Sequence, residues 1–414
     1  MKTRLLAAAV SLLTIGGSAP APLWAQDATP IRDRGQRGWT HSVVADELDY
    51  PWDIVRDGDQ LILTEKAGSI VMLGAGGPRR FRLDTSVALR NDGGAGLLGI
   101  ALAPDFAGTG RAFLYYSYAN GTAPLNRVIA AHFDGNAWRE TGVLVDAIPG
   151  HRLYNGGRIA IGPDGYLYVT TGWTENRARP QDLSSLAGKV LRLALDGTAP
   201  ADNPFGSSLV YSYGHRNPQG LAWNEAGELF VAEHGQSGLD EINIVRAGGN
   251  YGWPAISGDE TREGMEPPFL HSGSATWAPA GIAFAGGELL LTALQGRGLY
   301  VLDRAGRRLS PVFDTGERYR HVLPVDGDLY VITTNRSPRG QGPSKDRLLR
   351  LSRPRERRHA ASDPASPSRW PSGRDGPRPS GTSPLSRTAL MKRPHRFMRD
   401  SLSNLTEFSM IVVS

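Results

Sequence analysis

The chain has no cysteine among its 414 residues. Without thiols it can form no disulfide framework, no thiolate zinc site and no cysteine nucleophile. It also lacks, after the first 25 residues, any stretch approaching the ~20 apolar residues that a membrane-spanning helix needs. Glycine, by contrast, is abundant at 51 residues, and apolar residues make up 40% of the chain. This composition predicts a globular protein that is rich in tight turns and poor in helix.

The formal net charge of +5 is confined to the ends of the chain. Residues 353–414 hold 11 arginines and one lysine against five acidic residues, and Lys2 and Arg4 lie near the start. The part between, residues 26–352, is therefore slightly acidic. Because its surface has no excess of positive charge, we expect no nucleic-acid partner.

The first 25 residues have the three regions of a secretory signal peptide. Met1-Lys2-Thr3-Arg4 is basic, Leu5 to Ile15 is apolar, and small residues lead to Leu23-Trp24-Ala25. The apolar run is too short to span a bilayer. We expect cleavage near Ala25 and a soluble periplasmic or secreted protein without a membrane span; a retained N-terminal anchor is the alternative.

The last 62 residues, 353–414, differ in composition from the rest. The alternating apolar pattern stops after Leu351, and arginine, proline and serine dominate. Such a segment cannot bury enough apolar surface to offset its loss of conformational entropy, so we predict that it is disordered. A functional basic arm and a translated frame change are the alternatives.

Short apolar runs recur six times, about 54 residues apart, and each is followed by a second β-type run. The first runs are 61–64, 113–116, 167–170, 229–232, 289–292 and 329–332, and the second are 70–73, 128–130, 190–193, 242–245, 299–302 and 348–351. Small sheets with two apolar faces bury those faces when they are arranged radially. We therefore predict an all-β, six-bladed β-propeller over residues 39–352, in which Trp39 to Leu48 adds the strand that closes the last blade. A β-solenoid is the competing repeat fold, but its period is far shorter.

Three polar segments interrupt this pattern. Tyr211 to Leu221 contains His215, Arg216 and Asn217, which bind either each other or a polar ligand. The second segment is His234 to Asn243, followed by Gly248 to Pro254. It combines carboxylates with glycine turns whose backbone carbonyls are free to bind a ligand, and oxygen ligands of this kind are the ones that Ca²⁺ prefers. The alternative is that these residues form ordinary surface turns. In Arg318-Tyr319-Arg320, strand alternation predicts two arginines on one face, which would either hold an anion or be solvated.

At these residues the chain resembles the soluble quinoprotein glucose/sorbosone dehydrogenase family, which includes aldose sugar dehydrogenases. The similarity covers roughly residues 40–352. The motifs that carry it are Pro51-Trp52, Gly96-Leu97-Leu98-Gly99, Pro104-Asp105-Phe106, Asn155 to Ile159, Gly162 to Gly165, Gln181 to Lys189, Asp202 to Phe205, Gly214 to Gly220, Asp240 to Asn243 and Gly249 to Pro254.

The resemblance implies a six-bladed propeller that oxidises a sugar by hydride transfer to pyrroloquinoline quinone (PQQ), with a soluble electron acceptor. By the same resemblance, Arg216, Asn217 and Gln295 contact the quinone, and Arg318 and Arg320 hold its carboxylates. The backbone carbonyls of Gly235 and Gln236 match positions that hold a Ca²⁺ on the cofactor. Glu241 and Tyr251 match ligands of a structural Ca²⁺. The oligomeric state is not implied.

The chain departs from the family at the catalytic base. Tyr154 stands where the family has the histidine that takes the proton from the anomeric hydroxyl, so Tyr154 and Arg216 are the candidate catalytic residues. A free phenol has a pKa of about 10 and is a weak base unless a cation, such as Arg158 or Ca²⁺, lies beside it. His151 lies on the opposite face of an extended chain, from which only a rearranged loop could bring it in. Gln295 replaces a lysine of some members, Trp173 an acidic residue and His321 an aspartate.

Two further functions remain open at this point. A propeller that binds the quinone or a carbohydrate without catalysis is favoured by Tyr154 and Gln295. A Ca²⁺-dependent hydrolase or lactonase is the third possibility, although no motif identifies its base.

Overall fold

A computed structural model describes residues 38–353 of the chain, so the predicted signal peptide (1–25) and the predicted tail, apart from Arg353, lie outside the described residues. The described part is nearly all strand, with one short helix, α1 (Phe106–Thr109), and one 3₁₀ turn, η1 (Arg179–Gln181). None of its helices is long and apolar enough to cross a membrane. The prediction of a turn-rich all-β chain is confirmed.

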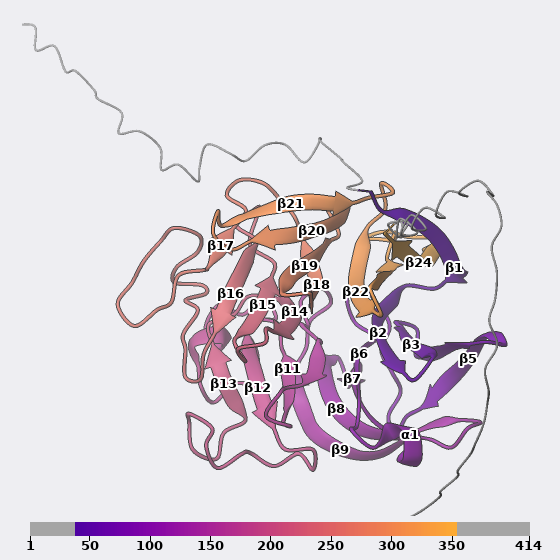
Figure 1. Cartoon of the computed structure of the whole chain (residues 1–414). Coiled ribbons are helices and arrows are strands. Elements are labelled where there is room, and N and C mark those ends of the chain that lie inside the picture. Colours follow the sequence, from indigo (N-terminus) through magenta and orange to yellow (C-terminus); the bar gives the residue numbers. More distant parts are fainter. Residues whose placement is uncertain (1–37, 354–414) are drawn as a thin grey trace, which may run out of the picture. The chain divides into compact units, whose positions relative to one another are not determined.

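The strands form units of four that follow one another along the chain (Figure 1). The strands of the first two units are β2 (Pro51–Asp57), β3 (Gln60–Glu65), β4 (Ser69–Gly74), β5 (Gly77–Asp84), β6 (Leu97–Leu102), β7 (Arg111–Asn120), β8 (Ala123–Phe133) and β9 (Trp138–Pro149). They make one eight-stranded sheet in the order β2-β3-β4-β5-β9-β8-β7-β6. Its two halves meet at a short parallel pairing of Leu83 and Asp84 with Trp138 and Arg139.

Three four-stranded sheets follow, each in simple sequential order. Their strands are β10 (Ile159–Ile161), β11 (Leu167–Thr170), β12 (Lys189–Leu193) and β13 (Val210–Tyr213); β14 (Pro218–Trp223), β15 (Leu229–Glu233), β16 (Glu241–Val245) and β17 (Leu270–His271); and β18 (Pro279–Ala285), β19 (Glu288–Ala293), β20 (Gly298–Asp303) and β21 (Arg308–Phe313).

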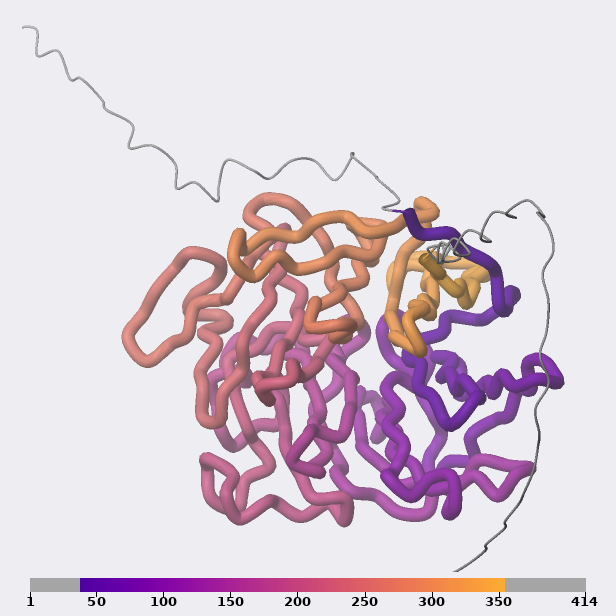
Figure 2. The backbone as a smooth tube through the Cα atoms, viewed as in Figure 1, coloured from indigo at the N-terminus to yellow at the C-terminus, as the bar shows by residue number. Residues whose placement is uncertain are grey.

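The last sheet joins the two ends of the described chain. It has the order β1-β24-β23-β22, from β1 (Thr40–Leu48), β22 (Tyr319–Val325), β23 (Asp328–Thr333) and β24 (Asp346–Ser352). Thr40 is opposite Ser352, and the indigo and yellow ends of the tube lie together in Figure 2. The predicted pairing of residues 39–48 with the last repeat is confirmed.

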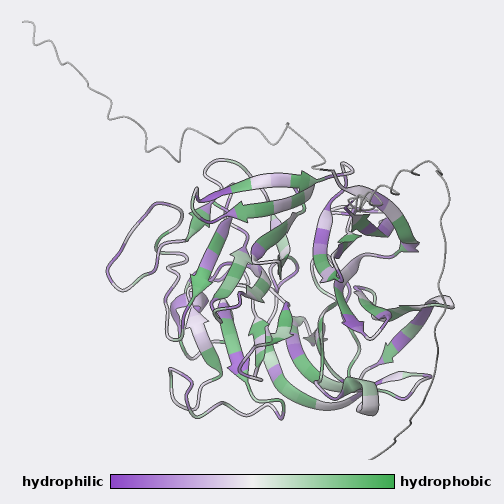
Figure 3. Ribbon diagram, viewed as in Figure 1, coloured by the Kyte–Doolittle hydropathy of each residue, from purple (hydrophilic) through white to green (hydrophobic). Residues whose placement is uncertain are grey.

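All twelve apolar runs of the repeat fall on strands at matching places in these units. The six first runs lie on β3, β7, β11, β15, β19 and β23, and the six second runs on β4, β8, β12, β16, β20 and β24. The hydrophobic residues follow the strands in Figure 3. The first strands contact one another in a series that runs from β10 to β6, β2, β22, β18 and β14, so the architecture is β-propeller-like.

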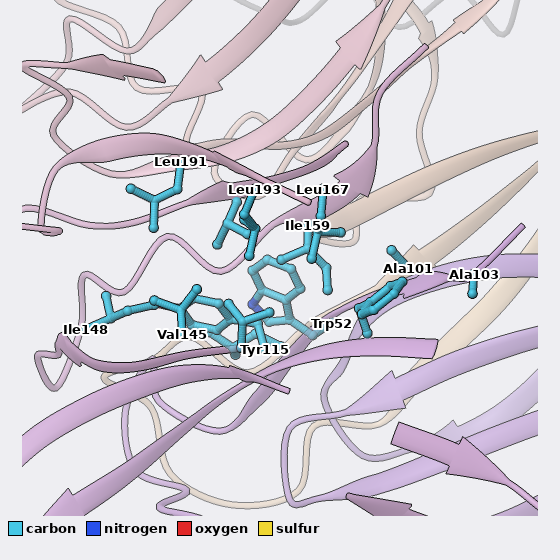
Figure 4. Close-up of a cluster of buried hydrophobic side chains, with 14 of the residues drawn as sticks. Trp52, Ala101, Ala103, Tyr115, Val145, Ile148, Ile159, Leu167, Leu191 and Leu193 are labelled. Carbon is cyan, nitrogen blue, oxygen red and sulfur yellow. The ribbon is translucent and has the colours of Figure 1, made fainter. Parts of the chain in front are cut away.

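The core lies between adjacent sheets. One cluster packs Tyr115 and Val145 from β7 and β9 against Ile159, Leu167 and Leu191 from the next sheet, and Trp52 of β2 joins it, as Figure 4 shows. Each of these side chains is at most 5% exposed. Because the apolar faces meet between units, no unit buries its own core alone.

The closing pair of strands gives a matched test of this packing. Leu349 on β24 is fully buried, whereas its cross-strand partner Val43 on β1 is 46% exposed. We expect Leu349→Ala to lower the free energy of unfolding by about 2–5 kcal/mol, because it leaves a cavity in the core. Val43→Ala should change it by no more than about 0.5 kcal/mol. Urea unfolding of both variants measures the difference, and equal losses would contradict the packing described here.

Candidate active site

One cavity of about 660 Å³ opens where the loops around the first strands converge. That volume is within the usual range for a small-molecule or cofactor site. The predicted catalytic and quinone-binding residues and the two residues predicted to hold Ca²⁺ on the cofactor all line it, namely Tyr154, Arg216, Asn217, Gly235, Gln236, Gln295, Arg318 and Arg320. The predicted convergence of the three arginines is therefore observed.

β-Bulges occur at two side chains that line the cavity, Arg320 and Gln219. In β22, Tyr319 is opposite Thr333 and His321 is opposite Ile332, so Arg320 is the extra residue of a bulge. Gln219 is the extra residue at the equivalent place in β14. Arg320 Nη1 donates to Gln219 Oε1 at 2.6 Å, and both residues line the cavity. Bulges redirect side chains next to functional sites. The orientation of Arg320 toward the cavity therefore reflects the bulge and not the simple alternation of side chains along a strand.

The guanidinium groups of the three arginines bind neutral acceptors. Arg216 Nη1 donates to His234 O at 3.0 Å, and Arg318 donates to the carbonyls of Thr334 and Leu294 at 3.1 and 3.2 Å. Nε of Arg216 and Nε of Arg320 are buried without any partner among the described residues. Burial and the nearby Arg320 lower the pKa of Arg318 to about 10. The cavity wall thus holds positive charge that no carboxylate neutralises through these contacts.

Aromatic rings surround Arg216. Its guanidinium carbon lies 4.9 Å from the ring centre of Tyr154, 5.5 Å from that of Trp173 and 5.3 Å from that of Trp253. Cation–π contacts of this length stabilise a buried guanidinium without neutralising its charge. Trp173 therefore forms one wall of an aromatic enclosure around Arg216.

The polar residues of the loop before β14 both bind each other and line the cavity, the two alternatives that the sequence left open. His215 is fully buried and bonds within the protein, with Nε2 2.8 Å from Ser212 Oγ and Nδ1 3.2 Å from Glu233 Oε1. Arg216 anchors its backbone N–H on Glu233 and turns its side chain to the cavity. Gly214 has φ +77°, and a Cβ there would come within 2.4 Å of Asn250 Oδ1, so only glycine fits the turn.

The four predicted metal-binding residues meet around a second, much smaller hollow. Gly235, Gln236, Glu241 and Tyr251 line this space of about 10 Å³, close to the volume that a single water occupies. Asn243 Oδ1 is buried without a partner, and Asn243 Nδ2 donates to Glu233 and Glu241 at 2.7 and 3.2 Å. Burial and the neighbouring Glu233 raise the pKa of Glu241 to about 8. Within residues 38–353, no group of three or more histidine and acidic side chains could hold a metal ion.

Arg158, which the sequence offered as a cation beside the phenol, is not among the residues that line the cavity. It forms an ion pair with Asp53, both residues being 2% exposed, and it lies 4.2 Å from the Trp52 ring centre. Burial raises the pKa of Asp53 to about 6, although Arg158 opposes this shift. His321 Nε2 is 3.6 Å from the same carboxylate. This cluster belongs to the buried centre of the first strands rather than to the cavity wall.

The cation beside the phenol of Tyr154 is Arg339, which the sequence did not suggest. Arg339 Nη2 donates to Tyr154 Oη at 3.3 Å from the loop between β23 and β24. Ser337, Pro338 and Arg339 all line the cavity. The rings of His151 and Tyr154 are stacked with their centres 5.4 Å apart, so the alternative of a rearranged loop is the one observed. The extended-chain geometry assumed for residues 151–154 does not hold there.

Several classes of ligand-binding protein have a β-propeller-like fold with a cavity over the first strands. Comparison with known proteins shows to which of these classes the chain belongs. Residues 48–342 match the glucose/sorbosone dehydrogenase family, and the chain belongs to that family.

Two curated relatives and one solved structure illustrate the similarity. Aldose sugar dehydrogenase YliI of Escherichia coli is 31% identical over 71% of this chain and 90% of its own. Quinoprotein glucose dehydrogenase B of Acinetobacter calcoaceticus is 31% identical over 61% of this chain and 59% of its own. The structure of the PQQ-bound aldose sugar dehydrogenase from Streptomyces coelicolor is 32% identical and superimposes with a TM-score of 0.68, covering 76% of this chain and 98% of that chain.

Because the positive charge in the cavity has no carboxylate partner, we predict that two equally buried arginines differ in their effect on the free energy of unfolding. Arg320 and Arg158 are both 2% exposed. We expect Arg158→Met to lower the free energy of unfolding by about 3–5 kcal/mol, because it strands the buried Asp53 carboxylate. Arg320→Met should be neutral or stabilising by about 1 kcal/mol in the protein without cofactor, because it removes a buried cation that lacks a carboxylate partner. Denaturant midpoints measure both effects. Similar decreases in the free energy of unfolding of the two variants would refute the idea that the buried charge of Arg320 destabilises the protein without cofactor.

Proposed function

We propose that this protein is an exported quinoprotein oxidoreductase that oxidises the C1 hydroxyl of an aldose to a lactone, with PQQ as its bound hydride acceptor. The observation that carries the proposal is the convergence of Arg216, Arg318 and Arg320 on one cavity without carboxylate partners. A ligand with several carboxylates would neutralise that charge, and PQQ carries three. Bidentate guanidinium–carboxylate contacts would fix its plane.

The cavity supplies a role for each predicted cofactor residue. Arg318 and Arg320 would hold carboxylates of the quinone, and Arg216, Asn217 and Gln295 would contact it. Arg318 Nη1 lies 3.5 Å from Gln295 Oε1, so these two side chains present neighbouring polar groups. Asn217 Oδ1 accepts the N–H of Gly156 at 3.1 Å, which fixes the amide at the cavity edge.

Ca²⁺ binding fits the loop after β15. Neither carbonyl of Gly235 and Gln236 accepts a backbone hydrogen bond from elsewhere in residues 38–353. A Cβ at Gly235 would lie 2.1 Å from Leu239 O, so the compact turn requires glycine. We propose that these two carbonyls hold Ca²⁺ on the cofactor, and that Glu241 and Tyr251, which line the smaller hollow, hold a structural Ca²⁺.

The chain's own groups divide the remaining work. Tyr154 would accept the proton of the sugar hydroxyl, and Arg216 would stabilise negative charge as it develops nearby. The rings of Trp173 and Trp253 exclude water from Arg216 on their sides. PQQ, when bound, supplies the acceptor for the hydride, and a soluble electron acceptor would reoxidise it.

The architecture is proposed to be six-bladed, over residues 39–352. The eight-stranded sheet counts as two blades, because its halves share only the short parallel link between β5 and β9. The six matched pairs of apolar runs support the same count. Export with cleavage near Ala25 stays a proposal from the leader sequence.

A second candidate function is quinone or carbohydrate binding without catalysis. It is favoured by the aromatic pair Tyr154 and Trp173, whose ring centres are 5.9 Å apart where the family has a histidine and often an acidic residue. Binding without turnover would distinguish this function.

Reconstitution tests the proposal directly. We expect the protein to bind PQQ in the presence of Ca²⁺, and an aldose to change the absorbance of the bound quinone as it is reduced. Arg318→Gln and Arg320→Met should weaken PQQ binding about 10- to 100-fold, because each removes a charged hydrogen-bond donor. Removal of Ca²⁺ by a chelator should abolish reduction.

Arg177→Gln is the matched control. Arg177 is exposed and bonds to Pro254 O, outside the residues that line the cavity, so this variant should bind PQQ as the unmodified protein does. Binding that is unaffected by Arg318→Gln and Arg320→Met would refute the proposal, whereas quinone binding without reduction by any aldose would favour the non-catalytic function.

A further inference from the structure

Four side chains that could accept a proton line the cavity: Tyr154, Glu175, His234 and Asp240. The family's base is missing, so a catalytic protein must use one of these or a group behind them. Their hydrogen bonds separate them, because a base needs an oxygen or nitrogen lone pair that faces the substrate.

Two of the four are occupied by the protein itself. Asp240 accepts the backbone N–H groups of Gly235, Trp277 and Ala278 at 2.6–2.9 Å, which hold its carboxylate in the loop. His234 Nε2 lies 2.8 Å from Pro279 O, to which it must donate, and its Nδ1 lies 3.5 Å from Asn217 Nδ2.

His151 and Glu175 are engaged with each other. His151 Nε2 lies 3.3 Å from Glu175 Oε2, and His151 Nδ1 accepts the N–H of Leu153 at 3.1 Å. Both ring nitrogens of His151 are therefore used, and His151 is not among the residues that line the cavity. Although its ring is stacked on Tyr154, His151 cannot take a substrate proton in this arrangement.

Tyr154 has a different environment. Its oxygen receives a hydrogen bond from Arg339, and the guanidinium of Arg216 faces its ring at 4.9 Å. The loop that carries Arg339 is held at both ends of its turn: Arg339 N donates to Ser337 Oγ at 3.1 Å, and Asn335 Nδ2 donates to Glu317 Oε1 and Lys345 O at 3.0 and 3.1 Å. A charged donor on a phenol oxygen stabilises its anionic form.

We propose that Arg339 is a positioning residue that holds Tyr154 as the proton acceptor of the reaction. The inference rests on the proposed function and deepens it. The phenolate of Tyr154 takes the hydroxyl proton of the sugar C1 as the C1–H bond breaks. The quinone, when bound, would accept the hydride from C1, and C1 would become the lactone carbonyl. Arg339 keeps its own proton throughout, and solvent at the cavity mouth later removes the proton from Tyr154.

The charges around the phenol all enter this pH dependence. Arg339 faces it from the loop after β23 and Arg216 from the loop before β14, and both carry positive charge. His151 is stacked on the ring, with Glu175 beyond it, 3.3 Å from the imidazole. Burial lowers the pKa of His151, so it adds no cation in the neutral range.

The pH dependence of turnover tests the pair. Tyr154→Phe should lower kcat about 10²- to 10⁴-fold, the usual effect of losing a general base. Arg339→Gln should lower kcat about tenfold at neutral pH and move the rising limb of the pH profile upward by about one unit. Arg339→Lys, which keeps the charge, should restore part of both, and Arg177→Gln should change neither. A profile unchanged by Arg339→Gln would overturn the inference.

A second measurement is independent of the cofactor. In protein without PQQ, the ultraviolet tyrosinate signal that is lost in Tyr154→Phe reports ionisation of this phenol alone. We expect that signal to move to higher pH in Arg339→Gln and to stay in place in Arg177→Gln. Failure of the unmodified protein to bind PQQ would count against the proposed function. An unmoved tyrosinate signal in a protein that does reduce PQQ would count against the role of Arg339 only.

Discussion

Positive charge gathered in a low-dielectric cavity is the constraint on which the site depends. Arg216 comes from the loop before β14, whereas Arg318 and Arg320 come from the start of β22 and the residue before it. Their guanidinium groups donate to neutral oxygens, and Arg216 also faces aromatic rings. Buried charge of this kind costs free energy in the unliganded protein. The rest of the framework must therefore be stable enough to hold the three groups until an anion arrives.

The framework supplies that rigidity through its first strands. A bulge interrupts the pairing near the start of β2, β6, β14, β18 and β22, and in β14 and β22 the extra residues are Gln219 and Arg320. Beside them, Arg158 donates to Gln219 O at 2.9 Å and pairs with Asp53. The guanidinium of Arg320 is thus supported, through Gln219, by a buried ion pair. The bulge interrupts the strand pairing and at the same time orients the side chain of its extra residue toward the cavity.

Much of the fold could be predicted from the sequence, because the second and third strands of each unit are buried on both faces and read as apolar runs. The first strands could not be located in this way: β14, for example, is Pro-Gln-Gly-Leu-Ala-Trp, whose polar residues serve the site. The three arginines were identified through their motifs. Arg339 was not, because its loop has no apolar period and its partner Tyr154 lies 185 residues away. The stacking of His151 on Tyr154 could not be predicted for a similar reason, since residues 151–154 form no strand and strand alternation does not apply to them.

The pairing of β1 with β24 has a consequence for how the protein is made. Thr40 and Ser352 are 312 positions apart, yet they bond across the same pair of strands. A ribosome releases β1 long before β24, so the first strand must wait for its neighbour while four complete sheets take shape. Until then β23 presents an open edge, and unsatisfied edges invite pairing with other chains. The nascent chain is thus exposed to aggregation until β24 emerges and pairs with β23 and β1.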